Sequence, residues 1–144
     1  MTTEIQKQLG ALPFTHVEGT VKFMLITSRT SKNWIIPKGW PKEEITDHDL
    51  AALEAYEEAG LGGQIEPKPI GHFNDIRKFA NHDEVRHRRI FVYPLLVTYH
   101  HIDWPEKGQR KLAWLDTRQA VSLVTNSELA SIISGFDVSR TSLS

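Results

Sequence analysis

Apolar and β-branched residues gather in a few short segments of the chain, and these segments predict the strands of a sheet. Residues 20–29, TVKFMLITSR, form an apolar run that is typical of a buried strand, and residues 33–37 predict a second, shorter one. Residues 90–100, IFVYPLLVTYH, are the strongest strand pattern, so we expect them at the centre of the sheet, with Pro94 indicating a bulge or an edge. Residues 111–116 predict a last short strand.

Helix formers dominate residues 50–60, LAALEAYEEAG, which predict a helix. Asp47 or Asp49 is expected to cap its first turn, and Gly60 is expected just past its C-terminal end. Leu50 and Leu53, together with several alanines, supply an apolar face for the core.

Two more helices are predicted near the C-terminus. Asp116 is expected to cap residues 117–124, and Asn126 or Ser127 is expected to cap residues 128–136.

Polar segments separate these elements. Residues 38–49 contain Gly, Pro and charges and predict a loop, while residues 69–89 predict a strand followed by a basic loop. Residues 137–144 are expected to fray. The order of strands, helix, strands and helices indicates a mixed α/β chain, and its 144 residues without internal repeats predict one domain, residues 1–144.

Composition excludes several classes of function. The net charge of −1 argues against a general affinity for nucleic acid or for an anionic membrane. The absence of cysteine excludes disulfides, thiolate zinc sites and a cysteine nucleophile. No apolar run reaches the roughly 18–20 residues of a membrane span, and the N-terminal residues 1–10 do not have the pattern of a signal peptide. We therefore expect a soluble, cytoplasmic protein.

Three glutamates crowd onto one face of the first predicted helix. Glu54, Glu57 and Glu58 are three or four positions apart, a spacing at which like charges cost an isolated helix about 0.2–0.5 kcal/mol per pair. A solvated acidic face is one interpretation. The other is a site for a hard divalent cation such as Mg²⁺, which binds one or two carboxylates together with substrate phosphates. The remaining glutamate could then deprotonate a water molecule.

Residues 39–61 resemble the Nudix box, G-x5-E-x7-R-E-U-x-E-E-x-G-U, in which U is a bulky aliphatic residue. The positions in register are Gly39, Glu54, Glu57, Glu58, Gly60 and Leu61, with Ala55 as a loose match for the central U. The resemblance implies the Nudix fold, an α/β (α+β) architecture in which a mixed β-sheet is sandwiched between α-helices.

The resemblance also implies roles for individual residues. Glu54, Glu58 and the backbone carbonyl of Lys38 would hold the metal, Mg²⁺ or alternatively Mn²⁺, and Glu57 matches the usual general base. Two charged box positions are apolar here, since Ile45 replaces the glutamate and Leu53 replaces the arginine. Because both charges are lost together, we interpret the change as an apolar brace in place of an ion pair; such exchanges are often neutral or stabilising.

Basic residues outside the box bear on the substrate. Arg86, His87, Arg88 and Arg89 precede the strongest strand, either as an ordinary charged loop or as a phosphate clamp. Residues 20–125 are similar to the diphosphoinositol polyphosphate phosphohydrolase branch of the family, which also cleaves diadenosine polyphosphates. The phosphate-binding positions that this resemblance implies are Ser28, Arg29, Arg86, His87, Arg88 and Arg110.

The substrate stays open at this point. Relatives that act on inositol pyrophosphates carry a basic cluster before the first strand, and residues 10–20 have none. A hydrolase of dinucleoside polyphosphates is therefore equally consistent with the sequence. A catalytically silent Nudix module that binds a nucleotide or phosphate ligand is the alternative class, although the intact glutamates argue against it. The sequence indicates a small-molecule polyphosphate as partner and is silent on the oligomeric state.

Overall fold

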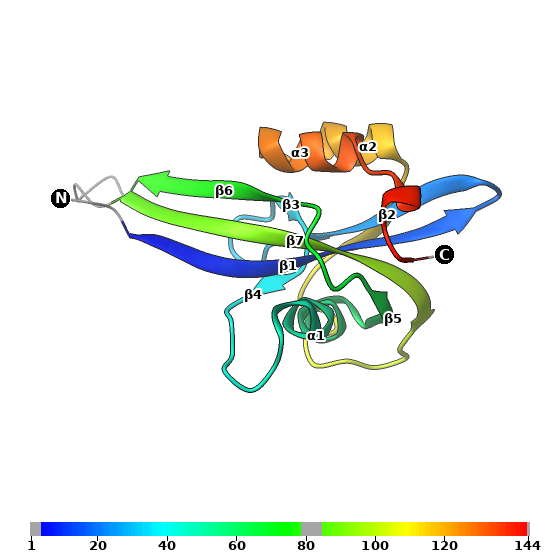
Figure 1. Cartoon of the computed structure of the whole chain (residues 1–144), viewed down its shortest axis with the longest axis horizontal. Helices are drawn as coiled ribbons and strands as arrows, with labels where there is room; N and C mark the ends of the chain where they lie inside the picture. The colour runs from blue at the N-terminus through cyan, green and yellow to red at the C-terminus, as the bar shows by residue number, and fades with distance from the viewer. Residues whose placement is uncertain (1–3, 79–84, 144) are drawn as a thin grey trace.

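The computed structural model describes residues 4–78 and 85–143, and in it one mixed sheet lies between two helical layers (Figure 1). Helix α1 covers one face of the sheet, and α2 and α3 cover the other. The helices are α1 (Asp47–Ala59), α2 (Thr117–Leu123) and α3 (Ser127–Ser134), followed by the short 3₁₀ turn η1 (Val138–Arg140). The strands are β1 (Ile5–Val17), β2 (Thr20–Thr27), β3 (Trp34–Ile35), β4 (Lys38–Gly39), β5 (Leu61–Ile65), β6 (Gly71–Lys78), β7 (Val85–His100) and β8 (Leu112–Leu115). The predicted fold class is confirmed.

The sheet is organised around β7, as predicted. The strand order is β3-β2-β1-β7-β5, with β4 paired to β1, β6 to β7 and β8 to β2. Strands β1 and β7 run parallel over ten registered pairs, whereas the other pairs are antiparallel. Pro94 lies where β7 changes partner from β6 to β5, and the register shift that marks a bulge lies instead at Gly62 and Gly63 of β5.

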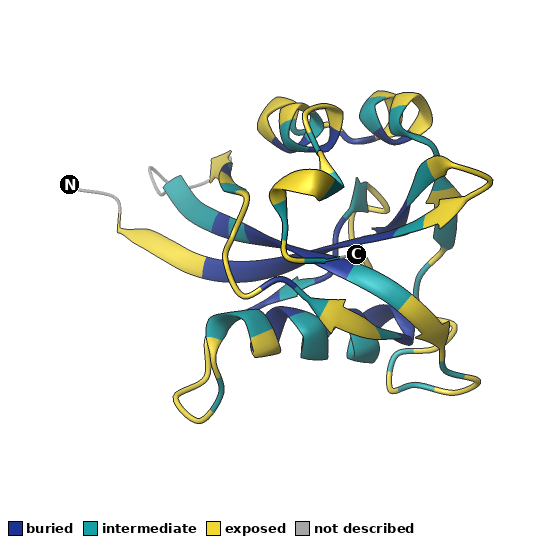
Figure 2. Ribbon diagram, turned by 45° about the vertical axis from the view of Figure 1, so that its right-hand side comes forward, coloured by how far each residue is buried: buried dark blue, intermediate teal, exposed yellow. Residues whose placement is uncertain are grey.

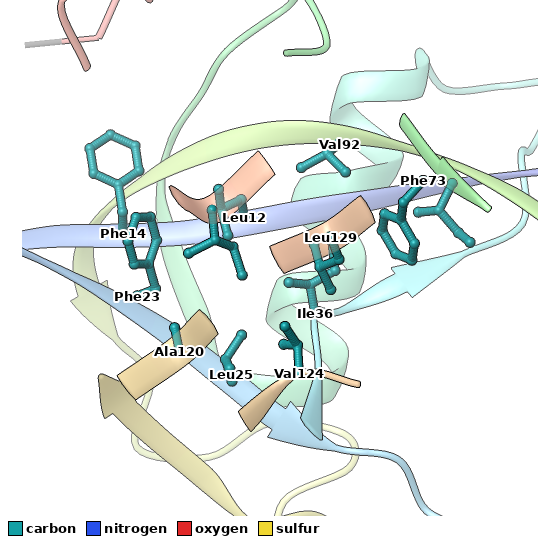
Figure 3. Close-up of a cluster of buried hydrophobic side chains, with 12 residues drawn as sticks. Leu12, Phe14, Phe23, Leu25, Ile36, Phe73, Val92, Ala120, Val124 and Leu129 are labelled. Carbon is teal, nitrogen blue, oxygen red and sulfur yellow. The ribbon is translucent and has the colours of Figure 1, made fainter. Parts of the chain in front are cut away.

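Two apolar clusters fill the spaces between the sheet and its helices. One lies under α2 and α3, where Leu12, Phe14 and Leu129 are fully or almost fully buried (Figure 3). The other lies under α1 and includes Leu50, three alanines of the helix and Tyr93 of β7. Burial is concentrated in the middle of the long strands, and exposed residues gather at their ends (Figure 2).

Helix α1 has the predicted C-terminal end but a different N-terminal cap. Gly60 adopts φ 72°, the left-handed conformation that favours glycine after a helix. Thr46, not Asp47 or Asp49, is the N-cap, because its side chain accepts the backbone N–H of Asp49. The two aspartates lie in the first turn, where they complement the helix dipole.

The caps of α2 and α3 are residues that the sequence predicted, and the Ile45/Leu53 pair lies where its prediction requires. Asp116 caps α2 in a capping box with Gln119, and Asn126 rather than Ser127 caps α3. Ile45 and Leu53 both pack against the cluster under α1, so an apolar brace stays a prediction consistent with their positions.

Several segments differ from the sequence-based expectation. Strands β1 and β5 were not predicted, and the basic residues 86–89 lie within β7 rather than in a loop. The loop expected between β6 and β7 falls on residues 79–84, outside the described residues. The expectation of a frayed tail is wrong for residues 137–143: η1 forms there, and Ser142 donates two hydrogen bonds to Glu66 through its backbone N (2.7 Å) and its Oγ (2.8 Å). No helix in the described part of the chain is long and apolar enough to cross a membrane.

Candidate active site

The C-terminal half of α1 presents two glutamates in mutual contact. Glu54 and Glu58 share a side-chain hydrogen bond, and Glu58 is only 4% exposed. Burial, reinforced by this hydrogen bond, raises the pKa of Glu58 to about 9. Burial also raises the pKa of Glu54. At neutral pH the pair therefore shares a proton, an arrangement that a bound cation would replace.

The loop before α1 approaches these glutamates closely. A Cβ atom at Gly39 would lie 2.3 Å from Oε1 of Glu54, so glycine is required for the observed approach. Lys38, whose carbonyl is the predicted third metal ligand, precedes Gly39 in β4. Among residues 4–78 and 85–143, no group of three His, Asp or Glu side chains is placed to hold a metal ion. The predicted set differs from such a group because it contains two carboxylates and one backbone carbonyl.

Arg110 joins this helix to the loop between β7 and β8. Its Nη2 lies 3.5 Å from Oε1 of Glu58 and 3.1 Å from Oε1 of Glu106, and its Nη1 donates to the carbonyl of Thr27 at 3.2 Å. The side chain is only 9% exposed. These contacts hold Glu58 and Glu106 to one guanidinium, and binding of a substrate by Arg110 stays a prediction.

Glu106 is a candidate that the sequence analysis did not single out. Its backbone N–H donates to the carbonyl of Glu57 at 3.0 Å, and its negative charge contributes to the raised pKa of both Glu54 and Glu58. Only its contact with Arg110 in the folded chain identifies Glu106 as a candidate, because no local sequence pattern does so. Glu57, the predicted base, lies on α1 but does not line the cavity described next.

A cavity of about 770 Å³ opens beside Glu58. It extends from the loop between β2 and β3, across β6 and β7, to the start of α3. Three acidic residues line it, Glu58, Asp75 and Glu128. Six cationic residues line it as well: Arg29, Lys38, Arg77, Arg86, Arg88 and Arg110. The excess of positive charge suits an anionic ligand.

Alternation along β7 divides the predicted phosphate clamp. Arg86 and Arg88 line the cavity, together with Arg77 of β6, which pairs with Arg86. His87 does not line the cavity, but its Nε2 forms a 2.8 Å hydrogen bond with the Oδ1 of Asn74, a residue that does line it. The structure therefore brings Arg86 and Arg88 to the cavity and leaves His87 outside its lining.

Arg88 is held in an unusual way. Its guanidinium lies 4.9 Å from the centre of the Trp40 ring, and its Nε is buried without a hydrogen-bond partner in the described structure. Burial, together with the charge of Arg86, lowers its pKa. An arginine that is stacked on one side and incompletely hydrogen-bonded is suited to receive an anion.

Ser28 and Arg29 complete the rim of the cavity. Ser28 Oγ forms hydrogen bonds with Ser31 Oγ and with the backbone N–H of Asn33, and so closes the turn between β2 and β3. Arg29 donates to Oε1 of Gln109 at 3.2 Å and lies 3.8 Å from Glu106. Both predicted residues are thus in the site.

Comparisons with known proteins agree on one family. No family model matches the chain. The chain is 29% identical over 140 residues to "Nudix hydrolase 21, chloroplastic" of Arabidopsis thaliana, covering 94% of this chain and 68% of that protein. It is 31% identical over 121 residues to "Diphosphoinositol polyphosphate phosphohydrolase 2" of Rattus norvegicus, covering 83% of this chain and 63% of that protein.

A solved structure shows the same fold. The Ap4A hydrolase of C. elegans matches with a TM-score of 0.62 and 17% identity, covering 90% of this chain and 94% of that one. The chain spans between 52% and 68% of the length of the first curated relatives it matches. The sheet, the box helix and these relatives together show that the chain has the Nudix fold and is similar in sequence to Nudix hydrolases.

Proposed function

We propose that this chain is a metal-dependent pyrophosphohydrolase that cleaves a diphosphate linkage in a nucleoside polyphosphate or diphosphoinositol polyphosphate type of substrate. The proposal rests on one observation: the glutamates of the box helix adjoin the cationic cavity. Glu58 of the box helix lines the same cavity as six cationic side chains. A metal-binding carboxylate beside a cationic cavity matches the charge of a metal–polyphosphate complex.

The residues present fit a divalent cation. Glu54 is half-buried and Glu58 is buried. The side chain of Glu54 lies close to Gly39, and the carbonyl of Lys38 directly precedes this glycine in β4. Hard oxygen donors of this kind suit Mg²⁺ and Mn²⁺. When bound, the cation would supply a Lewis acid that neutralises charge on phosphoryl oxygens.

We assign the acid–base chemistry to glutamates that do not bind the metal. Glu57 is our first assignment for the group that accepts a proton from water. Glu106 is the second, because Arg110 holds it beside Glu58 and its charge acts on both glutamates of the pair. Arg110 positions these groups by keeping the loop against α1. Replacing each glutamate by glutamine separates the two assignments, since loss of the true base removes the acidic limb of the pH profile of kcat/KM.

The substrate class is supported by the cavity and by the relatives. Arg86 and Arg88, with Arg29 and Ser28 at the rim, supply donors for several phosphates, and the cavity volume is in the range of small-molecule sites. Similar proteins are named diphosphoinositol polyphosphate phosphohydrolase and Ap4A hydrolase. The segment before β2 is the largely buried strand β1, and it lacks the basic cluster that relatives acting on inositol pyrophosphates carry. We therefore propose dinucleoside polyphosphates and inositol pyrophosphates as equally suitable substrates.

A substrate panel tests the proposal. Diadenosine polyphosphates, an inositol pyrophosphate, a nucleotide sugar and a nucleoside triphosphate are each incubated with the chain and Mg²⁺. We expect hydrolysis of at least one, loss of that activity with EDTA, and loss of most of it in Glu58→Gln. Tight binding of a panel member without any hydrolysis in Mg²⁺ or Mn²⁺ would instead favour a silent binding module.

A further inference from the structure

The loop between β7 and β8, residues 101–111, carries Glu106 past the C-terminal end of α1 (Figure 1). Its backbone contacts that end of the helix at two points. The N–H of His101 donates to the carbonyl of Gly60 at 2.8 Å, and the N–H of Glu106 donates to the carbonyl of Glu57 at 3.0 Å. The position of Glu106 beside the box helix therefore depends on how this loop is held against the helix.

The side chain of Trp104 packs over the same end of α1. A Cβ atom at Gly60 would lie 2.5 Å from Cε3 and 2.6 Å from Cδ2 of the indole, so the ring lies directly on this glycine. The ring of His100 lies 5.1 Å from the indole, and Nε2 of His100 donates to the carbonyl of Ala59 at 2.9 Å. Nζ of Lys107 lies 5.3 Å from the centre of the indole ring. The indole therefore joins the loop to the last turn of the box helix.

The N–H of this indole makes no hydrogen bond. In the part of the chain that the structure describes, Nε1 of Trp104 is buried and has no acceptor. A buried donor without an acceptor lowers the stability of a fold, so the ring is not held there by its polar atom. Its contribution is the shape of a flat ring that fills the space above Gly60. A phenyl ring, which has no N–H group, should fill much of this space.

We propose that Trp104 is a positioning residue, whose ring docks the loop on the end of α1 and so sets Glu106 against Arg110. Glu106 accepts from Nη2 of Arg110 at 3.1 Å, and the same nitrogen lies 3.5 Å from Oε1 of Glu58. Neither Trp104 nor Glu106 is among the described residues that line the cavity, so Trp104 acts through Glu106 and not on the substrate. The inference rests on the proposed function and deepens it, because it names the residue that places a candidate acid–base group.

The position of the loop is measured first, without metal or substrate. The variants are Trp104→Leu, Trp104→Phe and the control Trp114→Leu, which changes a 38% exposed tryptophan of β8 outside the cavity. Backbone hydrogen exchange, followed by NMR, reports whether the Glu106 N–H stays bonded to Glu57, and the amide of the buried Leu95 reports global stability. We expect Trp104→Leu to speed exchange at Glu106 by about tenfold or more, and the other two variants to change it less than about twofold.

Kinetics on a hydrolysed member of the substrate panel then test the positioning. We expect Trp104→Leu to lower kcat about tenfold or more with KM changed less than about twofold, since a group displaced by about 1 Å loses its alignment while the cavity is untouched. Trp104→Phe should restore kcat to within about twofold of wild type, because the ring is kept. In a Glu106→Gln background, Trp104→Leu should have little further effect, because the group that it positions is already lost.

Three results would overturn the inference. The first is wild-type protection of the Glu106 amide in Trp104→Leu. The second is an equal loss of kcat from Trp104→Leu in the wild-type and Glu106→Gln backgrounds, which would show that the ring supports only general stability. The third is a wild-type kcat in Glu106→Gln. If Trp104→Leu frees the Glu106 amide but wild type hydrolyses no member of the panel, the docking role of Trp104 stands and the proposed function fails.

Discussion

Replacing Gly39 by alanine should damage the metal site while leaving the fold intact. The new methyl carbon would lie 2.3 Å from Oε1, 2.4 Å from Cδ and 2.9 Å from Cγ of Glu54. Non-bonded carbon atoms are comfortable at about 3.5–4.0 Å, so the carboxyl group must move by about 1 Å or more. Because Glu54 ends in a flexible side chain, it can turn away, but it then loses its hydrogen bond with Glu58.

The magnitude follows from these contacts. Overpacking of this size costs about 1–3 kcal/mol of unfolding free energy. A carboxylate displaced by about 1 Å no longer meets the near-ideal octahedral geometry of Mg²⁺, so we expect metal affinity to fall by about a hundredfold or more, beyond the 10- to 100-fold typical of outer-shell changes. Chemical denaturation gives the first quantity, and calorimetry with Mg²⁺ gives the second.

Two controls sharpen this experiment. Gly71→Ala in β6 adds a methyl that meets only Ile132 at 3.6 Å, an ordinary contact, so it should leave metal affinity unchanged. In a Glu54→Ala background the clash is absent, so Gly39→Ala should cost clearly less stability than in wild type. Wild-type Mg²⁺ affinity in Gly39→Ala, or the same cost in both backgrounds, would refute the assignment of the metal site to Glu54 and its loop.

Three other predictions concern separate parts of the molecule. Because Glu58 has a pKa raised to about 9, Mg²⁺ must displace a proton at neutral pH, so its affinity should rise by up to about tenfold per pH unit from pH 6 to 9. Calorimetry in two buffers of different ionisation enthalpy should detect the released proton, and its absence would contradict the shared-proton pair. Trp40→Leu removes the ring over Arg88, a contact worth about 0.5–1 kcal/mol at exposed sites, and should raise KM for long polyphosphates with little change in kcat, whereas Trp40→Phe should not. Glu66→Gln weakens a 7% exposed acceptor of two Ser142 hydrogen bonds, so it should lower the free energy of unfolding by about 1–3 kcal/mol and speed proteolysis of the tail; an unchanged cleavage rate would show that this contact does not hold the tail.

Local sequence determined the box helix and its chemistry. The strong helix formers of residues 50–60, the glycine at position 60 and the three glutamates at helical spacing were sufficient to predict α1, its C-terminal end and the carboxylates on it. The apolar run at residues 90–100 was likewise sufficient for the central strand. These features depend on neighbours a few residues apart, which a single sequence displays directly.

Strand β1 shows why other parts of the fold were missed. Gly10 and Pro13 interrupt its pattern, and its stability comes from a parallel partner, β7, about 80 residues away in the chain. Such a pairing is set by tertiary packing rather than by local propensity. The N-cap of α1 was missed for a smaller reason: three neighbouring residues can all cap a helix, and only the backbone conformation selects Thr46.

Tertiary structure alone decided how the predicted residues divide in the site. The four basic residues 86–89 are equivalent in the sequence, but alternation along β7 places Arg86 and Arg88 in the lining of the cavity and leaves His87 and Arg89 outside it, both hydrogen-bonded to Asn74. Arg110 reaches Thr27 across 83 positions of sequence and brings Glu106 to the box helix. The raised pKa of Glu58 arises in the same way, because burial and charge depend on which segments meet in space.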